Sequence, residues 1–99
     1  MSVMMLRSTF NEENVADVQA ALGKVFQALE QAQPAGMRYA ATRLSDGVTF
    51  VAILEFENDE DNPLRALPAY AELLDNLKEW QAEPATVEQM TVIGSYRLF

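Results

Sequence analysis

The fold of this chain is decided by residues 37–56, which read MRYAATRL-SDG-VTFVAILEF. Two runs of strand-forming residues flank Ser45-Asp46-Gly47, and Asp-Gly is strongly associated with the tight type I′ turn of a β-hairpin. We therefore predict an antiparallel hairpin in which Asp46-Gly47 is a two-residue loop. In this register the facing pairs are Arg43 and Phe50, Tyr39 and Leu54, and Arg38 and Glu55.

Both faces of the predicted hairpin are apolar. A sheet with one wet face would alternate apolar and polar residues, so something must cover each side. Helices of the same chain can cover one side, and we expect this to be the face of Tyr39, Phe50, Leu54 and Phe56. So short a chain leaves little to cover the other. Each large side chain there gains about 1.5–3 kcal/mol on burial, so we predict a homodimer through this open face. It carries Ala40, Leu44, Val51 and Ile53.

The amino-acid composition and the net charge exclude several classes of function. The 99 residues suit one domain, 1–99, and 49% of them are hydrophobic, as in folded proteins. The chain has neither His nor Cys, which removes the commonest general base and metal ligands. We predict no metal and no cofactor. A net charge of −8 opposes binding to nucleic acid or anionic membranes, so neither is an expected partner. Without a signal peptide or long apolar run, a cytoplasmic location is expected.

The first half of the chain reads as a strand followed by a helix. Strand-compatible residues occupy Val3–Thr9. Asn11 or Asn14 can cap a helix, and apolar residues then recur at steps of three and four. Pro34 and Gly36 end this helix, because proline disfavours a helical residue before it. The apolar stripe that we assign to the core consists of Val15, Val18, Leu22, Val25 and Leu29.

The second half adds an acidic loop, a helix and a strand. Residues 57–62 lack the spacing of a calcium loop, and Asn62 can cap a helical turn that begins at Pro63. Because an interior proline breaks a helix, we predict a short turn over Pro63–Leu67 and a helix over Pro68–Trp80. For Trp80 we favour packing against the sheet edge; the alternative is that it closes a pocket. A strand follows over Val87–Leu98, with Gly94 as a candidate bulge. The helical stripe is Leu64, Leu67, Tyr70, Leu74 and Leu77.

This order of elements predicts an α+β fold of the ferredoxin-like βαββαβ type, an antiparallel four-stranded sheet with two helices on one face. Together with residues 47–57 and the closing stretch 92–98, it resembles the dimeric α+β barrel superfamily, within it the antibiotic-biosynthesis-monooxygenase-like group. Glu55 matches an acidic residue that often ends the third strand there, but Glu57 stands where an aromatic residue would follow. The resemblance implies a dimeric α+β barrel and cofactor-independent oxygenation of a hydrophobic aromatic metabolite.

Two functions remain open from the sequence: such an oxygenase, or a non-catalytic dimeric binding or accessory protein. A pocket would need polar groups in an apolar lining. The hypothesis we favour for ligand binding joins Arg38, Thr42 and Glu55 on one hairpin face, where burial would allow Glu55 to act as a base. The alternative is that Arg38 and Glu55 only pair across the hairpin. Further polar candidates are Arg7, Arg43, Ser95, Tyr96 and Arg97, with Tyr39, Tyr96 and Trp80 as hydrogen-bond donors.

Overall fold

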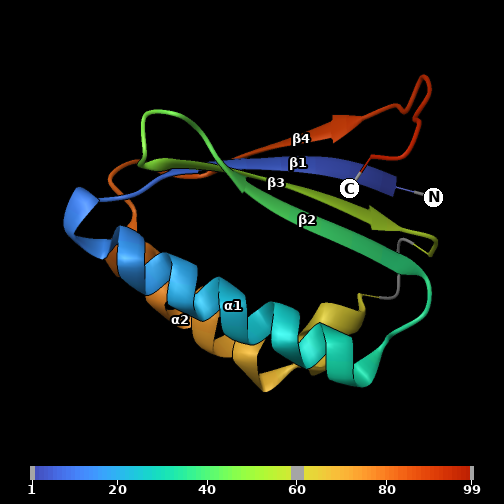
Figure 1. Ribbon diagram of the computed structural model, residues 1–99, viewed down its shortest axis with the longest axis horizontal. Helices are drawn as coiled ribbons and strands as arrows, with labels where there is room; N and C mark the ends of the chain where they lie inside the picture. Colours follow the sequence, from blue (N-terminus) through green and yellow to red (C-terminus); the bar gives the residue numbers. More distant parts are fainter. Residues whose placement is uncertain (1, 59–61, 99) are drawn as a thin grey trace.

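The computed structural model describes residues 2–58 and 62–98, which form one antiparallel sheet with both helices on the same side (Figure 1). The strand order is β2-β3-β1-β4. The predicted α+β, ferredoxin-like arrangement is therefore confirmed. The elements in chain order are β1 (Ser2–Thr9), the 3-10 turn η1 (Glu12–Asn14), α1 (Val15–Ala32), β2 (Met37–Arg43), β3 (Thr49–Phe56), the 3-10 turn η2 (Pro63–Ala66), α2 (Pro68–Trp80) and β4 (Thr86–Met90).

The hairpin has the predicted register but a different turn. Arg38 lies opposite Glu55, as expected. The type I′ prediction was wrong, because Gly47 alone in this loop has a positive φ, whereas a type I′ turn requires two such residues. Asp46 instead keeps an ordinary backbone, and its carboxylate accepts hydrogen bonds from the amides of Val48 and Thr49 and from the Thr49 hydroxyl. We expected the type I′ backbone conformation to hold this loop in shape. Instead, hydrogen bonds to the Asp46 carboxylate hold it.

The helices begin and end close to their predicted limits. At the start of α1 neither asparagine caps the helix, contrary to expectation: the Asn14 side chain donates to Asp17, and η1 supplies the first turn instead. Asn62 does cap η2, accepting from the Leu64 amide at 3.0 Å. The rest of the predicted acidic loop, residues 59–61, lies outside the described residues. Neither helix in the described ranges is long and apolar enough to cross a membrane.

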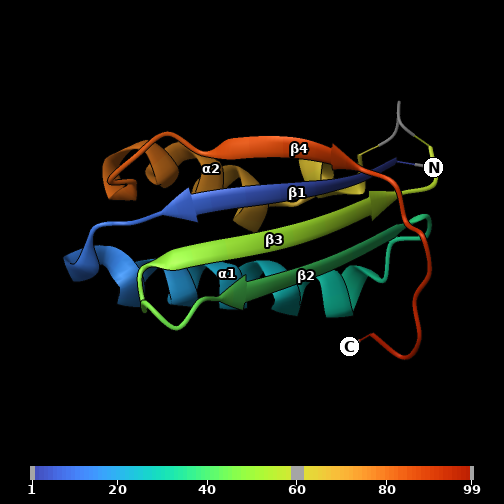
Figure 2. The ribbon, with the colours of Figure 1, turned by 90° about the horizontal axis from the view of Figure 1, so that it is seen from above.

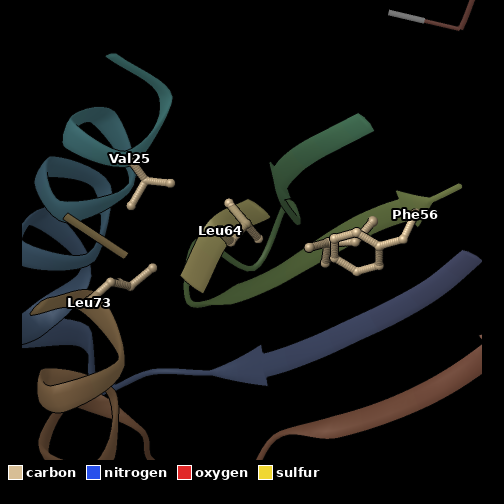
Figure 3. Packing of buried hydrophobic residues seen from close by; sticks show 5 residues of the cluster. Val25, Phe56, Leu64 and Leu73 are labelled. Atoms are coloured by element: carbon tan, nitrogen blue, oxygen red, sulfur yellow. The ribbon is translucent and has the colours of Figure 1, made fainter. Parts of the chain in front are cut away.

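The core lies between the helices and the sheet face that we expected beneath them. Figure 3 shows Val25, Leu64, Leu73 and Phe56 gathered there from α1, η2, α2 and β3. The predicted stripe of α2 was wrong at one step, because Leu73 is buried whereas Leu74 is 47% exposed. The helix is rotated so that Leu73 meets the sheet, while Leu74 borders the space between α2 and the sheet.

The last strand is shorter than predicted. β4 pairs only with β1, and its end at Met90 lies opposite Val3, close to where β1 itself begins. The ladder between β1 and β4 ends there, and Gly94 is not a bulge because it lies outside the sheet. The following segment, which we name the C-terminal arm (residues 91–98), runs across the end of the sheet from the β4 edge towards the β2 edge (Figure 2). Its Ile93 is 94% exposed.

Candidate functional site: a tyrosine-lined chamber between sheet and helices

The predicted ligand-binding residues lie on the open face of the sheet, away from the helices. Arg38 and Glu55 face each other across the hairpin, and Glu55 is half-buried. The Thr42 hydroxyl donates to the carbonyl of Val51 at 2.8 Å, which uses its proton within the sheet. No ion pair joins Arg38 and Glu55 in the part of the chain that the structure describes. The three residues share a face, as expected. Thr42 also borders the open groove described below, whereas Arg38 and Glu55 line neither that groove nor the chamber between sheet and helices.

A small chamber of about 90 Å³ lies between the sheet and the helices. β1, β2 and β3 form its floor, and α1 and α2 form its roof. Leu6, Phe50, Leu54 and Leu77 are typical of its apolar wall. Among the described lining residues, only Ser8, Tyr39 and Tyr70 have polar side chains. A mainly apolar pocket with a few polar groups is the usual form of a small-molecule site.

The two tyrosines are the chemically distinctive groups of the chamber. Burial, reinforced by the nearby Tyr70, raises the pKa of Tyr39 to about 12. Burial also raises the pKa of Tyr70, although Arg65 opposes this shift. Both phenols therefore stay protonated at neutral pH and act as donors. Within residues 2–58 and 62–98, no protein group accepts a hydrogen bond from either hydroxyl, whereas the Tyr39 ring packs on Phe26 with centroids 4.9 Å apart.

An open groove continues outward from the chamber between α1 and β2. Its volume is about 410 Å³, and it shares Leu22, Ala41 and Phe50 with the chamber lining. At its outer end Arg43 donates a 2.6 Å hydrogen bond to the side-chain carbonyl of Gln19. The chamber alone is smaller than the cavity of about 150 Å³ that is known to admit benzene. Even a ligand with a single aromatic ring must therefore extend into the groove.

The remaining sequence candidates are scattered. Arg7 lies on the open face, and the C-terminal arm carries Ser95, Tyr96 and Arg97, of which Arg97 lies over the Tyr96 ring. Trp80 packs against both core clusters, and it also lines a pocket between α1 and α2. Sequence reasoning named Tyr39 and Arg43 as candidates but missed Ser8 and Tyr70. A tyrosine within the apolar stripe of α2 was the available signal, because a buried phenol normally finds a partner.

The lining side chains define which ligands the chamber and the groove can hold. In the described ranges, no three His, Cys, Asp or Glu side chains are grouped so that they could hold a metal ion. The chamber and the groove together can hold a flat apolar molecule, and the two tyrosines can donate hydrogen bonds to an oxygen atom that carries negative charge. No carboxylate lines the chamber or the groove among the residues described.

Comparisons with known proteins agree on the fold. No family profile and no curated protein matches the sequence. Among solved structures, an antibiotic biosynthesis monooxygenase superposes with a TM-score of 0.79 at 17% identity, covering 95% of this chain and 100% of the other. A mutant of SnoaB, a cofactor-independent oxygenase from Streptomyces nogalater, gives a TM-score of 0.70 at 16% identity, with 98% of this chain and 97% of the other covered.

A third similar structure carries no assigned activity. NE2512, a protein of unknown function from Nitrosomonas europaea, matches with a TM-score of 0.72 at 16% identity, covering 99% of this chain and 94% of the other. At such low identity the likeness concerns the backbone rather than the reaction. The resemblance noted in the sequence is thus confirmed for the architecture: this chain has the ferredoxin-like fold of the antibiotic biosynthesis monooxygenases.

Proposed function

We propose that this protein binds a small aromatic metabolite between its sheet and helices and orients a ligand oxygen with the hydroxyls of Tyr39 and Tyr70. One observation carries the proposal: two protonated phenols without protein acceptors in the described part of the chain face an otherwise apolar chamber. No fully buried side-chain nitrogen or oxygen of the described residues lacks a hydrogen-bond partner, so both hydroxyls reach solvent. A ligand oxygen would replace water as their acceptor. The aromatic surface of Phe26 and Phe50 at the start of the groove fits a flat ring.

The same donors suit cofactor-independent oxygenation, which is our proposed reaction. Neutral phenols that donate to a phenolate or enolate oxygen stabilise the ionised form of the substrate, the form that is electron-rich enough to react with O₂. With an anthrone as substrate, the ring CH₂ becomes a carbonyl, one oxygen atom of O₂ enters the product and the other leaves as water. The shared fold with a cofactor-independent oxygenase supports this class.

The second candidate, a binding protein without catalysis, rests on the absence of a base. Among the described lining residues of the chamber and the groove there is no carboxylate that could remove a substrate proton, and the chain has no histidine. The substrate would then have to arrive ionised or lose its proton to water. An oxygenase is consequently restricted to phenols, enols and activated CH₂ acids such as anthrone, whereas a binding protein has no such limit.

The proposed assembly is a homodimer through the open face of the sheet. No helix of the described chain covers this face (Figure 2), which carries the half-buried Met5, Ile53 and Met90. Its strand charges balance, two positive against two negative, in a protein with a net charge of −8. Two copies can therefore meet there without strong repulsion. The four charged residues are Arg7, Arg38, Glu55 and Glu88.

The C-terminal arm supports the same assembly. It retains strand-forming residues but pairs with no strand of the described chain, and Val92, Ile93 and Leu98 are exposed. A second copy would offer both a sheet edge and an apolar surface. In such a dimer the predicted site of Arg38, Thr42 and Glu55 would lie between the two sheets, and it stays a proposal for ligand binding. A cytoplasmic location likewise stays a prediction.

Binding is tested by comparing 2-naphthol with naphthalene, which lacks the hydroxyl, by calorimetric or fluorescence titration. We expect the wild type to prefer 2-naphthol, and the Tyr39→Phe/Tyr70→Phe double variant to lose about tenfold in affinity for 2-naphthol only. Tyr96→Phe, on the exposed arm, is the matched control. Equal affinity of the wild type for both compounds would refute the proposal. An oxygen electrode with anthrone then separates the two functions, since only an oxygenase consumes one O₂ per anthrone above the uncatalysed rate.

A further inference from the structure

The groove that leads into the chamber has a single formal charge, and that charge is positive. Of the seven basic residues in the chain, only Arg43 lies in the described lining of the chamber or the groove, and no acidic residue accompanies it there. The surrounding molecule has a net charge of −8. The mouth of the groove is therefore locally positive, although the protein as a whole is strongly negative.

The structure holds this guanidinium without neutralising it. Arg43 ends β2 on the helix side of the sheet, opposite Phe50, and Gln19 of α1 accepts its hydrogen bond at 2.6 Å. The neutral amide oxygen of Gln19 holds one nitrogen of the guanidinium in place but does not neutralise its positive charge. The remaining N–H groups can donate to another acceptor. A guanidinium fork matches a carboxylate with two parallel hydrogen bonds.

We infer that Arg43 is a specificity-determining residue that selects aromatic ligands with a carboxylate, or another acidic substituent, at the end opposite the oxygen bound by the tyrosines. This inference rests on the proposed binding function. The chamber and the groove adjoin through Leu22, Ala41 and Phe50, so one elongated ligand can occupy both. Its phenolic end lies at Tyr39 and Tyr70, its ring crosses Phe26 and Phe50, and its anionic end reaches Arg43. Gln19 acts as a positioning residue for the guanidinium.

The test uses two fluorescent probes that share one ring system: 2-naphthol and 6-hydroxy-2-naphthoic acid, which adds a carboxylate across the ring from the hydroxyl. We expect the wild type to bind the acid at least about tenfold more tightly than 2-naphthol. Arg43→Gln should remove this preference while it leaves the affinity for 2-naphthol within about twofold. Arg43→Lys should keep part of the preference, because it keeps the charge.

A matched control separates a local contact from the general field of the protein. Lys24→Gln removes the same charge from an exposed position on α1 outside the groove, and it should leave both affinities unchanged. Equal loss of preference in Lys24→Gln and Arg43→Gln would overturn the inference, as would a wild type that binds both probes equally. Failure of the wild type to bind either probe would instead overturn the proposed binding function. Thermal melts of each variant identify any loss of folding.

Discussion

Replacing Tyr39 with phenylalanine should separate ligand binding from folding. The Tyr39 ring packs on Phe26 and within the core, and phenylalanine keeps that packing. The hydroxyl has no hydrogen-bond partner in the described part of the chain, so its removal breaks no contact of the protein. At pH 7 we therefore expect the free energy of unfolding of Tyr39→Phe to equal that of the wild type or to exceed it by up to about 1 kcal/mol.

The free energies of unfolding of the wild type and of Tyr39→Phe should differ increasingly in alkaline solution. Burial raises the pKa of Tyr39 to about 12, whereas an unfolded tyrosine titrates near pH 10, as an order-of-magnitude reference. Below about pH 10 both states hold the proton. Above it the unfolded state loses the proton first, so the wild type loses stability until the pH passes the folded pKa. At about pH 11 the unfolded state gains a factor of roughly ten, or about 1.4 kcal/mol, which Tyr39→Phe does not experience.

Urea denaturation at several pH values from 7 to 11 measures this difference, with Tyr96→Phe as the control, because Tyr96 is exposed. The control should follow the wild type throughout. The argument fails if Tyr39→Phe is destabilised by more than about 2 kcal/mol at pH 7, since that would reveal a structural hydrogen bond of the hydroxyl. It fails equally if the curves of Tyr39→Phe and wild type remain parallel up to about pH 11.

Three further predictions concern the fold and the assembly. Leu64→Ala, at a fully buried position in η2, should cost about 2–5 kcal/mol in urea denaturation; a cost below about 1 kcal/mol would show that the site collapses. Ile53→Asp, on the open face, should yield monomers in sedimentation velocity at micromolar concentration, and an unchanged dimer would place the interface elsewhere. Hydrogen bonds from Thr49 lower the pKa of Asp46, so Asp46→Ala should lower the melting temperature at neutral pH. That difference should shrink as the pH falls through the lowered pKa, and a pH-independent difference would contradict it.

Local signals predicted most of the fold. The Asp46-Gly47 pair placed the hairpin, and the period-2 pattern on either side then determined every facing pair of β2 and β3. Proline positions separated η2 from α2 at the correct residue. These successes share a cause: each depends on backbone chemistry within a few residues, which one sequence contains in full.

The errors arose where the outcome depends on distant partners. Residues 91–98 have the composition of a strand, but the pairing of β4 with β1 ends at Met90, opposite Val3, and the arm pairs with no strand of the described chain. Apolar residues on both faces of the hairpin likewise concealed which side holds a cavity. The sequence offered Arg38, Thr42 and Glu55 as a site, which stays a proposal, but it did not indicate the tyrosine pair, because Tyr70 comes from a helix packed across the sheet. Only the tertiary arrangement brings it to Tyr39.

The two faces of the sheet differ in a way that separates assembly from chemistry. The open face combines apolar residues with balanced charges, a composition that suits contact between identical surfaces. The helix-covered face has two phenols without a protein acceptor among the described residues and one cation, Arg43, at the mouth of the groove. This asymmetry would be costly in a symmetric interface but useful for holding a ligand in one direction. Because alternate residues of β2 and β3 serve opposite faces, a one-residue shift of register would exchange these roles. The register determined by the hairpin turn is thus a condition for the ligand site as well as for the dimer.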